Sequence, residues 1–202
     1  RHTRCSRDWS SDVCSSDLEI DILVNNAGAI PPGRIDQIDD ATWRSAWDLK
    51  VFGFINLTRE IYAGMKARGT GAIVNVIGIA AECNRAGYIV GSSGNAALVA
   101  FTRALGAESV DHGVRVVGVS PGRIQTDRQL RSVREAARQK FGDSERWPEM
   151  LSEMSSAFPF KRFGQPAEVA DLVVYLASER ASYISSTIVN IDGGQSYRPG
   201  NY

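Results

Sequence analysis

The alternation of short apolar runs with segments of helical spacing constrains the fold most strongly. The apolar runs, rich in Val and Ile, occupy residues 22–24, 72–77, 114–119 and 188–191. Continuous apolar runs of this length are typical of strands that are buried on both faces. Strands that alternate with helices favour a parallel sheet with helices on both faces. The sequence therefore predicts an α/β fold with a doubly wound parallel sheet.

The helical segments lie between these runs. Asp39 or Asp40 can cap a helix that continues to about Ala67. Apolar side chains recur at i, i+3, i+4 and i+7 across residues 92–109 and again across 169–176. That spacing forms one apolar face of a helix, which is suited to packing on a sheet.

Length and composition limit the classes of function. The 202 residues suit one domain, and the 43% hydrophobic content is enough to form a core. No apolar run approaches the roughly 20 residues of a membrane span. The formal net charge of +0 gives no reason to expect nucleic acid or a membrane as partner. The 3 Cys and 2 His have no spacing of a disulfide framework or a metal site. We expect a soluble, cytoplasmic protein without a metal.

Residues 1–18 differ from the remainder of the chain. They are rich in Ser, Asp and Arg, lack sustained apolar periodicity and lack the apolar centre of a signal peptide. The segment looks like translated sequencing-adapter DNA, so we interpret it as a non-native scar that precedes a domain at residues 19–202. A natural disordered tail is the alternative. On the scar interpretation, Cys83 is the only native cysteine.

Residues 126–165 are polar and helix-prone, without a strand pattern. An insertion after the carboxyl end of a strand lies where open α/β sheets bind ligands. Its larger apolar side chains, which are suited to covering a pocket, are Met150, Leu151, Met154, Phe158 and Phe160. We predict a substrate lid, and the alternative is a surface excursion without substrate contact.

Four motifs in order resemble the short-chain dehydrogenase/reductase family, from about Asp21 to Ser196. They are Asn-Asn-Ala-Gly at residues 25–28, Ile-Val-Asn-Val at 73–76, Pro-Gly-Arg-Ile-Gln-Thr at 121–126, and Pro-Ala-Glu-Val-Ala at 166–170 followed by Asp-Gly-Gly at 192–194. The resemblance implies a Rossmann-type fold that binds NAD or NADP. The cofactor-binding residues that it implies are Asn25, Ala27, Gly28, Asn95, Pro121, Gly122, Ile124 and Thr126. A simple β-turn at 25–28 and a simple strand terminator at Pro121 are the alternatives.

The first strands of the family pattern and its Gly-rich phosphate loop have no counterpart in this sequence. The position of that loop lies before Asp21, where the predicted scar stands. The loop supplies the main pyrophosphate site of such folds, and a residue near it selects NAD or NADP. We therefore expect a partial dinucleotide-binding domain whose strand at residues 22–24 forms an exposed edge.

The catalytic positions of the family pattern are substituted. The resemblance implies a Tyr, with a Lys four residues later on the same helical face, and a Ser and an Asn from preceding segments. Alignment on residues 96–98 puts Gly91 at the Tyr position and Asn95 at the Lys position. It also puts Gly78 at the Ser position and Lys50 at the Asn position. Neither glycine can donate a proton from a side chain.

Tyr88, Lys50 and Asn95 are the remaining catalytic candidates. Tyr88 lies three residues before the usual Tyr position, about 5 Å along a helix, so it either moves inwards or packs beside the cleft. Lys50 shares a predicted uncharged face with Ala46, Gly53 and Leu57, so it either points to the cleft or extends to solvent. Ser92 and Ser93 can orient a carbonyl or cap a helix.

These observations leave two hypotheses of function. The first is an NAD(P)-dependent oxidoreductase that acts on a carbonyl/alcohol pair of a small molecule, similar to 3-oxoacyl reductases. The second is a non-catalytic protein of the same fold that binds a cofactor or a partner subunit. The resemblance also implies a homodimer or homotetramer formed through helices around residues 43–66 and 92–109.

Overall fold

In a computed structural model, which describes residues 19–198, four parallel strands form one sheet. The strands, adjacent in chain order, are β1 (Ile22–Asn25), β2 (Gly71–Val76), β3 (Val114–Pro121) and β4 (Ile188–Ile191). Ile73 lies opposite Leu23 on one side and Val116 on the other. The predicted parallel sheet is confirmed, and each strand lies within two residues of its predicted bounds. The segment 1–18 lies outside the described residues.

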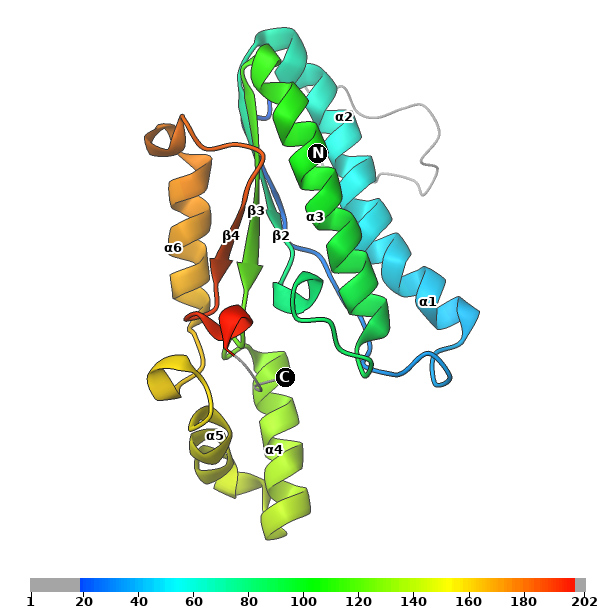
Figure 1. Cartoon of the computed structure of the whole chain (residues 1–202), viewed down its shortest axis with the longest axis vertical. Coiled ribbons are helices and arrows are strands. Elements are labelled where there is room, and N and C mark those ends of the chain that lie inside the picture. The colour runs from blue at the N-terminus through cyan, green and yellow to red at the C-terminus, as the bar shows by residue number, and fades with distance from the viewer. Residues whose placement is uncertain (1–18, 199–202) are drawn as a thin grey trace, which may run out of the picture.

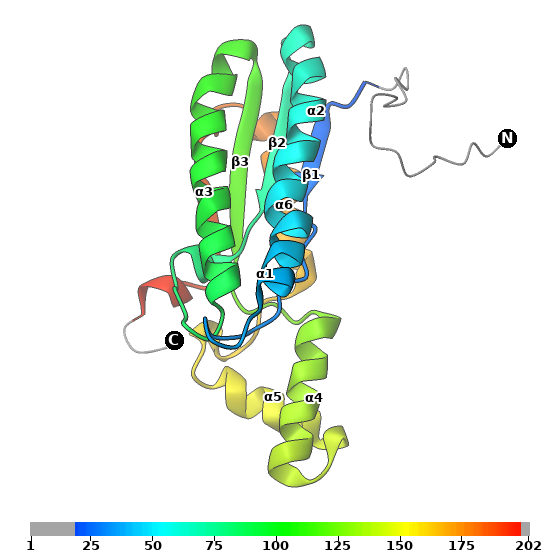
Figure 2. The ribbon, with the colours of Figure 1, turned by 90° about the vertical axis from the view of Figure 1, so that its right-hand side faces the viewer.

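Helices cover both faces of this sheet, as predicted (Figures 1 and 2). The helices α1 (Asp40–Trp47), α2 (Gly53–Arg68) and α3 (Ile89–Ser109) lie on one side. The helix α6 (Pro166–Ala177) packs on β2 and β3 from the other side. The helices α4 (Asp127–Phe141) and α5 (Trp147–Ser155) contact each other beyond the carboxyl ends of the strands. A sheet between two helical layers and a protruding hairpin thus make up the fold.

Alternate residues of the strands supply the two halves of the core. Ile73 and Val116 pack with Met65 of α2 on one face. Val74 and Val117 pack with Leu176 of α6 on the other. Both faces of the central strands are therefore mostly apolar, which explains why their sequences are rich in Val and Ile, with Asn75 in β2 and Arg115 in β3 as polar exceptions.

The long helix predicted to end near Ala67 is interrupted. Asp39 caps its start, because its carboxylate accepts the amide of Thr42 at 2.7 Å. A π-helical turn (Asp48–Phe52) then separates α1 from α2. The wider turn shifts the face of the helix, so Leu57 is 46% exposed, and the prediction that it shares one face with Lys50 is wrong. The helix predicted at residues 92–109 is also longer, because it begins at Ile89.

A buried polar chain crosses the sheet beneath the helices. The amide of Asn25 donates to Thr58 Oγ1 at 3.0 Å and to Asn75 Oδ1 at 2.8 Å. The amide of Asn75 donates in turn to Thr102 Oγ1 at 2.9 Å. All four side chains are buried. The chain thus ties β1 and β2 to the helices α2 and α3, and its polar groups satisfy each other away from water.

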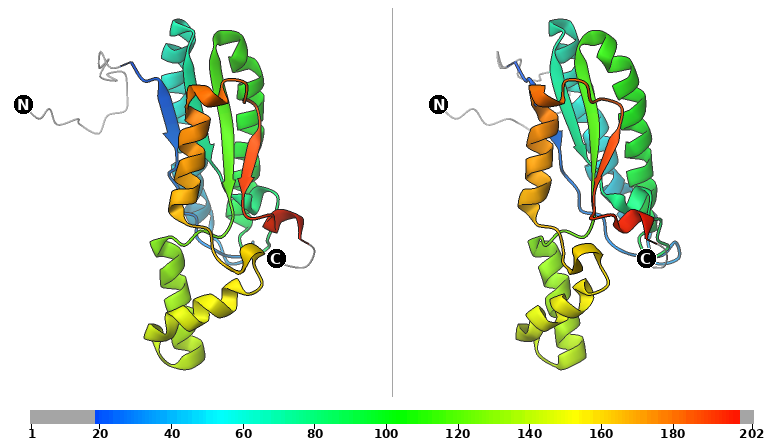
Figure 3. Two further views of the ribbon diagram at one scale, coloured as in Figure 1. Left: turned by 90° about the vertical axis from the view of Figure 1, so that its left-hand side faces the viewer. Right: turned by 60° about the vertical axis from the view of Figure 1, so that its left-hand side comes forward.

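β1 and β4 form the two edges of the sheet (Figure 3). Leu23 is buried, but Ile22 and Val24 on the opposite face are 51% and 42% exposed. The predicted exposed edge at β1 is therefore present. Within residues 19–198, no helix is long and apolar enough to cross a membrane. In the same part of the chain, no group of His, Cys, Asp or Glu is arranged to hold a metal ion.

Candidate active site

Three turns meet at the carboxyl ends of β1, β2 and β3, and one of them contains the substituted position Gly78. Residues 26–28 follow β1, Gly78 follows β2, and the turn at 121–126 ends β3. The carboxyl ends of parallel strands lie at one edge of a sheet, which is the usual ligand-binding edge of such folds. The sheet topology therefore gathers these three turns, which are far apart in sequence.

Lys50 is buried at this edge. Its side chain is only 8% exposed, and Nζ donates to the carbonyl of Ile77 at 2.6 Å. Its stem lies against the turn at Gly28, where an added Cβ would be 3.2 Å from Lys50 Cδ. Burial, with a smaller contribution from the charge of Arg128, lowers the pKa of Lys50 to about 8. The alternative that Lys50 extends to solvent is wrong.

Asn95 binds the carbonyl that follows the one bound by Lys50. Its Nδ2 donates to the carbonyl of Gly78 at 3.2 Å, so Lys50 and Asn95 bind consecutive carbonyls, those of Ile77 and Gly78. Asn95 is 3% exposed, and its buried Oδ1 has no hydrogen-bond partner within residues 19–198. Burying an acceptor without a donor lowers the stability of the fold. A ligand hydroxyl that donates to Oδ1 would remove this cost.

Tyr88 folds back over Gly91. It precedes the first residue of α3 with a non-helical backbone (φ −143°, ψ 39°). Its ring fills the space above Gly91, where an added Cβ would lie 2.0 Å from Cε1. The helical spacing of about 5 Å therefore does not apply to Tyr88, because Tyr88 is not itself helical. Burial raises the pKa of Tyr88, and the charge of Arg128 partly opposes this.

The serines near the start of α3 bind backbone groups. Ser92 Oγ accepts the amide of Arg85 at 3.3 Å, and Ser93 Oγ donates to the carbonyl of Ile89 at 2.8 Å. Neither side chain caps α3, because Tyr88 occupies the cap position without a side-chain bond. Ser92 instead links Arg85 to the helix that carries Asn95.

In each of the two predicted cofactor-binding turns, some residues are bonded within the fold and others have groups that are open to a ligand. The side chain of Asn25 belongs to the buried polar chain, whereas residues 26–28 are exposed. Gly122 donates to the carbonyl of Ile191 at 3.0 Å, and Thr126 caps α4 by accepting the amide of Gln129. The sequence motif thus mixes residues that hold the turns with residues that are free to bind a ligand.

Ile124 provides an open backbone group in the second turn. Its amide donates no hydrogen bond to any residue of the described part of the chain, whereas the amides of Gln125 and Thr126 bind the carbonyls of Gly164 and Ile124. The adjacent Pro121 ends β3 and fixes the entry to the turn. The amide of Ile124 is therefore able to bind an acceptor on a ligand.

A cavity of about 360 Å³ lies between this turn and the segment after α5. Phe158 and Phe160 line it, but Met150, Leu151 and Met154 do not. The latter three lie on α5, which contacts α4 instead. Only two of the five side chains that are suited to covering a pocket thus line this cavity, because α4 and α5 form a hairpin of their own.

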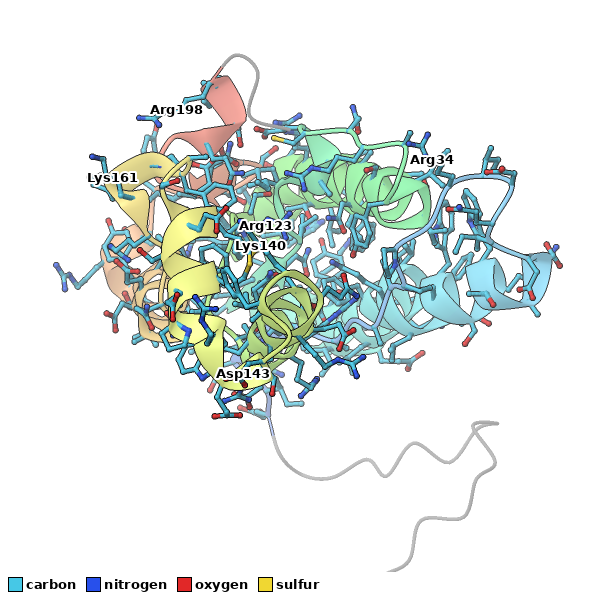
Figure 4. The ribbon with its side chains drawn as sticks, turned by 90° about the horizontal axis from the view of Figure 1, so that it is seen from below. Arg34, Arg123, Lys140, Asp143, Lys161 and Arg198 are labelled. Carbon is cyan, nitrogen blue, oxygen red and sulfur yellow. The ribbon has the colours of Figure 1, made fainter. Side chains whose placement is uncertain are left out.

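Arg123 lines the same cavity, and sequence analysis did not select it. Seen from the α4–α5 end, Arg123 lies within the outline of the molecule, whereas Lys161 and Arg198 lie towards its periphery (Figure 4). Burial lowers the pKa of Arg123, and the charge of Arg85 acts in the same direction. An irregular turn has no repeating pattern in its sequence. Only burial in the folded structure therefore distinguishes Arg123 from the exposed arginines.

Comparison with known proteins gives a consistent result. A family model described as Enoyl-(Acyl carrier protein) reductase matches residues 8–196, so the match includes part of the segment before Glu19. The chain is 35% identical over 179 residues to Nodulation protein G of Azospirillum brasilense, with 89% of this chain and 67% of that protein covered. It is 30% identical over 193 residues to an Acetoacetyl-CoA reductase of Cupriavidus necator, covering 93% and 73%.

Solved structures agree with these relatives. L-sorbose reductase of Gluconobacter frateurii, solved in complex with NADPH and L-sorbose, superposes with a TM-score of 0.81 at 33% identity. The superposition covers 88% of this chain and 67% of that one. YwfH, an NADPH-dependent reductase involved in bacilysin biosynthesis, gives a TM-score of 0.78 at 29% identity, with 86% and 66% covered. The chain thus spans about two thirds of the length of most of these proteins.

Proposed function

Because the chain belongs to the short-chain dehydrogenase/reductase family, a family of NAD(P)-dependent oxidoreductases, we propose that it interconverts a carbonyl and an alcohol on a small molecule. The observation that carries this proposal is the pair of bonds from Lys50 and Asn95 to the consecutive carbonyls of Ile77 and Gly78. The pair holds an amine and an amide at the end of β2, on the ligand-binding edge of the sheet.

The residues at this edge fit a nicotinamide cofactor. The partnerless Oδ1 of Asn95 suits a ribose hydroxyl, and the open amide of Ile124 suits the oxygen of a carboxamide. Ala27 and Gly28 form an exposed turn where a ligand can approach the backbone closely. The cofactor, when bound, supplies or accepts the hydride of the reaction.

Lys50 is the proposed proton-exchanging residue. With a pKa of about 8, its ammonium and amine are both populated near neutral pH, the condition in which a general acid or base works best. Lys50 and Asn95 are also exchanged relative to the family pattern, which has Asn at the first position and Lys at the second. The positive charge has thus moved from α3 to the turn between α1 and α2.

Tyr88 is the proposed proton donor to the substrate oxygen. Its phenol is protonated near neutral pH, as donation to a carbonyl oxygen requires, although burial raises its pKa and so makes it a weaker acid than a free phenol. Its ring fills the space above Gly91, close to the position where the family pattern has a Tyr. Asn95 is a positioning residue, since its amide holds the carbonyl of Gly78.

Steady-state reduction of a broad ketone panel with NADH and NADPH tests this proposal. We expect a break in kcat near pH 8 that Lys50→Met removes, together with a loss of about 10²–10⁴ in kcat. Lys66→Met, an exposed position on α2, is the matched control and should leave both unchanged. Unchanged turnover in Lys50→Met would remove Lys50 from the mechanism.

The alternative is a cofactor-binding protein without turnover. Gly78 and Gly91, which carry no reactive side chain, favour it. Fluorescence titration with NADH and NADPH separates the two functions. Binding without turnover on the whole panel would overturn the enzyme and leave the binding function. Absence of binding would overturn both.

We also propose a cytoplasmic homodimer or homotetramer. The large apolar side chains of Leu49, Phe52 and Leu57 are about half exposed on the π-helical turn and α2, and self-association would cover them. Light scattering coupled to size-exclusion chromatography measures the mass directly. A monomer at micromolar concentration would contradict this proposal.

A further inference from the structure

Positive charge collects around the candidate active site. Arg85 is half buried, and its carbonyl accepts the amide of Tyr88 at 3.0 Å. Arg128, at the start of α4, donates to the carbonyl of Ile30 at 2.7 Å, and its charge acts on both Lys50 and Tyr88. Arg123 lines the cavity of about 360 Å³, whose wall includes neither Lys50 nor Tyr88, and the charge of Arg85 acts on it. Three arginines and Lys50 therefore share one region.

These cations lack carboxylate partners. Across residues 19–198, no Asp or Glu oxygen lies within 4.0 Å of the charged nitrogens of Arg85, Arg123, Arg128 or Lys50. The only side-chain bond of Arg123 in this part of the chain is a long one, 3.4 Å, to the neutral Gln129. Five other arginines within residues 19–198 do pair with a carboxylate, as Arg146 does with Glu149, so an unpaired arginine is notable here only where it is also shielded from water. Lys50 is buried and Arg85 and Arg123 are half-buried, whereas Arg128 is exposed. Unneutralised positive charge at the shielded positions opposes folding, so an external anion would stabilise it.

The acidic groups close to the cavity are already engaged. Glu168 pairs with Arg162, with 2.6 Å between Oε1 and Nη2. Asp192 accepts the amides of Gly194 and Ser196 at 2.8 Å and 2.7 Å. Glu82 accepts the amide of Asn190 at 2.7 Å. None of these carboxylates forms an ion pair with Arg123, but Asp192 binds neutral donors and therefore keeps its negative charge on the cavity wall.

We propose that the carbonyl substrate itself carries an oxyanion, a carboxylate or a phosphate, which Arg123 binds at the cavity wall with the support of Arg85. This inference rests on the proposed function and specifies its substrate class. The planar guanidinium suits such a group, because it donates two parallel hydrogen bonds to two oxygens. Phe158 and Ile124 in the same wall suit a short apolar chain between the anion and the carbonyl. A cavity of about 360 Å³ lies at the small end of ligand pockets, which favours a compact acid.

Anion binding is measurable without cofactor or turnover. The probes are 4-oxopentanoate and its uncharged methyl ester, titrated calorimetrically into the full chain. We expect the acid to bind at least tenfold more tightly than the ester, a difference of about 1.4 kcal/mol. Arg123→Gln should abolish this preference, and Arg123→Lys should keep part of it. Arg103→Gln, an exposed arginine on α3, is the matched control and should keep all of it. Equal binding of acid and ester, or an unchanged preference in Arg123→Gln, would overturn the proposal.

A second titration separates the substrate from the phosphates of the cofactor as the source of the anion. We expect Arg123→Gln and Arg85→Gln to change the Kd of NADPH less than twofold. A tenfold loss of NADPH affinity with unchanged acid binding would assign the arginines to the cofactor and overturn the proposal. Circular dichroism of each variant reports folding. If the chain binds the acid but reduces no ketone, the oxidoreductase function fails while anion binding stands, so the two failures are distinguishable.

Discussion

The phenol ring of Tyr88 occupies the volume that a side chain on Gly91 would need, with Cε1 2.0 Å and Cζ 2.3 Å from the position of an added Cβ. The two residues are three positions apart, but Tyr88 lies outside the helix that contains Gly91. The absence of a side chain at residue 91 is therefore what allows the Tyr88 ring to lie at the site.

Substitution of Gly91 by Ala tests this relationship. The new methyl group must displace the Tyr88 ring, so we expect Gly91→Ala to lower the free energy of unfolding by about 1–3 kcal/mol. The double variant Tyr88→Ala, Gly91→Ala removes the clash, and Ala is favoured over Gly within a helix by roughly 1 kcal/mol. It should therefore be more stable than Gly91→Ala in urea denaturation.

Gly87→Ala is the matched control for this pair, because an added Cβ there has no atom within 4 Å. We expect its effect to stay within about 0.5 kcal/mol. Equal destabilisation by Gly87→Ala and Gly91→Ala would show that the ring of Tyr88 does not fill the space above Gly91.

The pKa of Lys50 predicts a stability change in alkaline solution. The folded chain releases the Lys50 proton near pH 8, whereas the unfolded chain holds it to about pH 10.5. Between these values the unfolded state binds more protons, so stability rises with pH and is lost as pH falls towards 8. Relative to Lys50→Met, we expect the free energy of unfolding of the wild type to increase by about 2 kcal/mol from pH 8 to pH 10.

Lys66→Met controls for general alkaline effects, since Lys66 is exposed on α2. Its difference from the wild type should stay constant over the same pH range. If Lys50→Met also ran parallel to the wild type, the Lys50 amine would be hydrated and the proposed proton exchange at pH 8 would lose its basis.

The buried polar chain predicts that Thr102→Val lowers the free energy of unfolding more than the same substitution at an exposed threonine. Valine keeps the shape of threonine but removes the Oγ1 that accepts the amide of Asn75. The amide is then buried without a partner, so we expect a loss of about 1–3 kcal/mol in the free energy of unfolding. Thr70→Val, at an exposed position in the turn before β2, is the comparison and should cost about 0.5 kcal/mol or less. Similar costs at both positions would contradict a buried network.

Local backbone strain predicts a stabilising substitution. Phe160 and Lys161 both have positive φ, at 53° and 51°, which side-chain-bearing residues rarely adopt. Glycine tolerates this conformation but loses more entropy on folding, so we expect a net gain of roughly 0.5 kcal/mol from Lys161→Gly. Lys161→Ala removes the same side chain and charge without relieving the strain, so thermal denaturation should show no gain for it.

The local pattern of the sequence determined the sheet, the faces of the helices and the turns that close the strands. Val116 and Val117 pack against helices on opposite faces of the sheet, so both side chains are apolar. A run of neighbouring apolar residues therefore identifies β3 in the sequence. Asp39 is recognisable as a cap for the same reason, because its bond to Thr42 joins residues three positions apart. The family motifs also follow from these local segments, since each is a contiguous turn or strand end.

Only the tertiary structure decided what the substituted positions do. Whether Lys50 is buried depends on a π-helical turn that changes the face of the helix, and on Ile77, which lies on another element. The place of Tyr88 depends on its non-helical backbone, and the charge around Arg123 depends on loops that meet at the end of the sheet. Spacing along the chain fixes contacts within one element, whereas contacts between elements depend on how their ends are brought together by packing on the sheet.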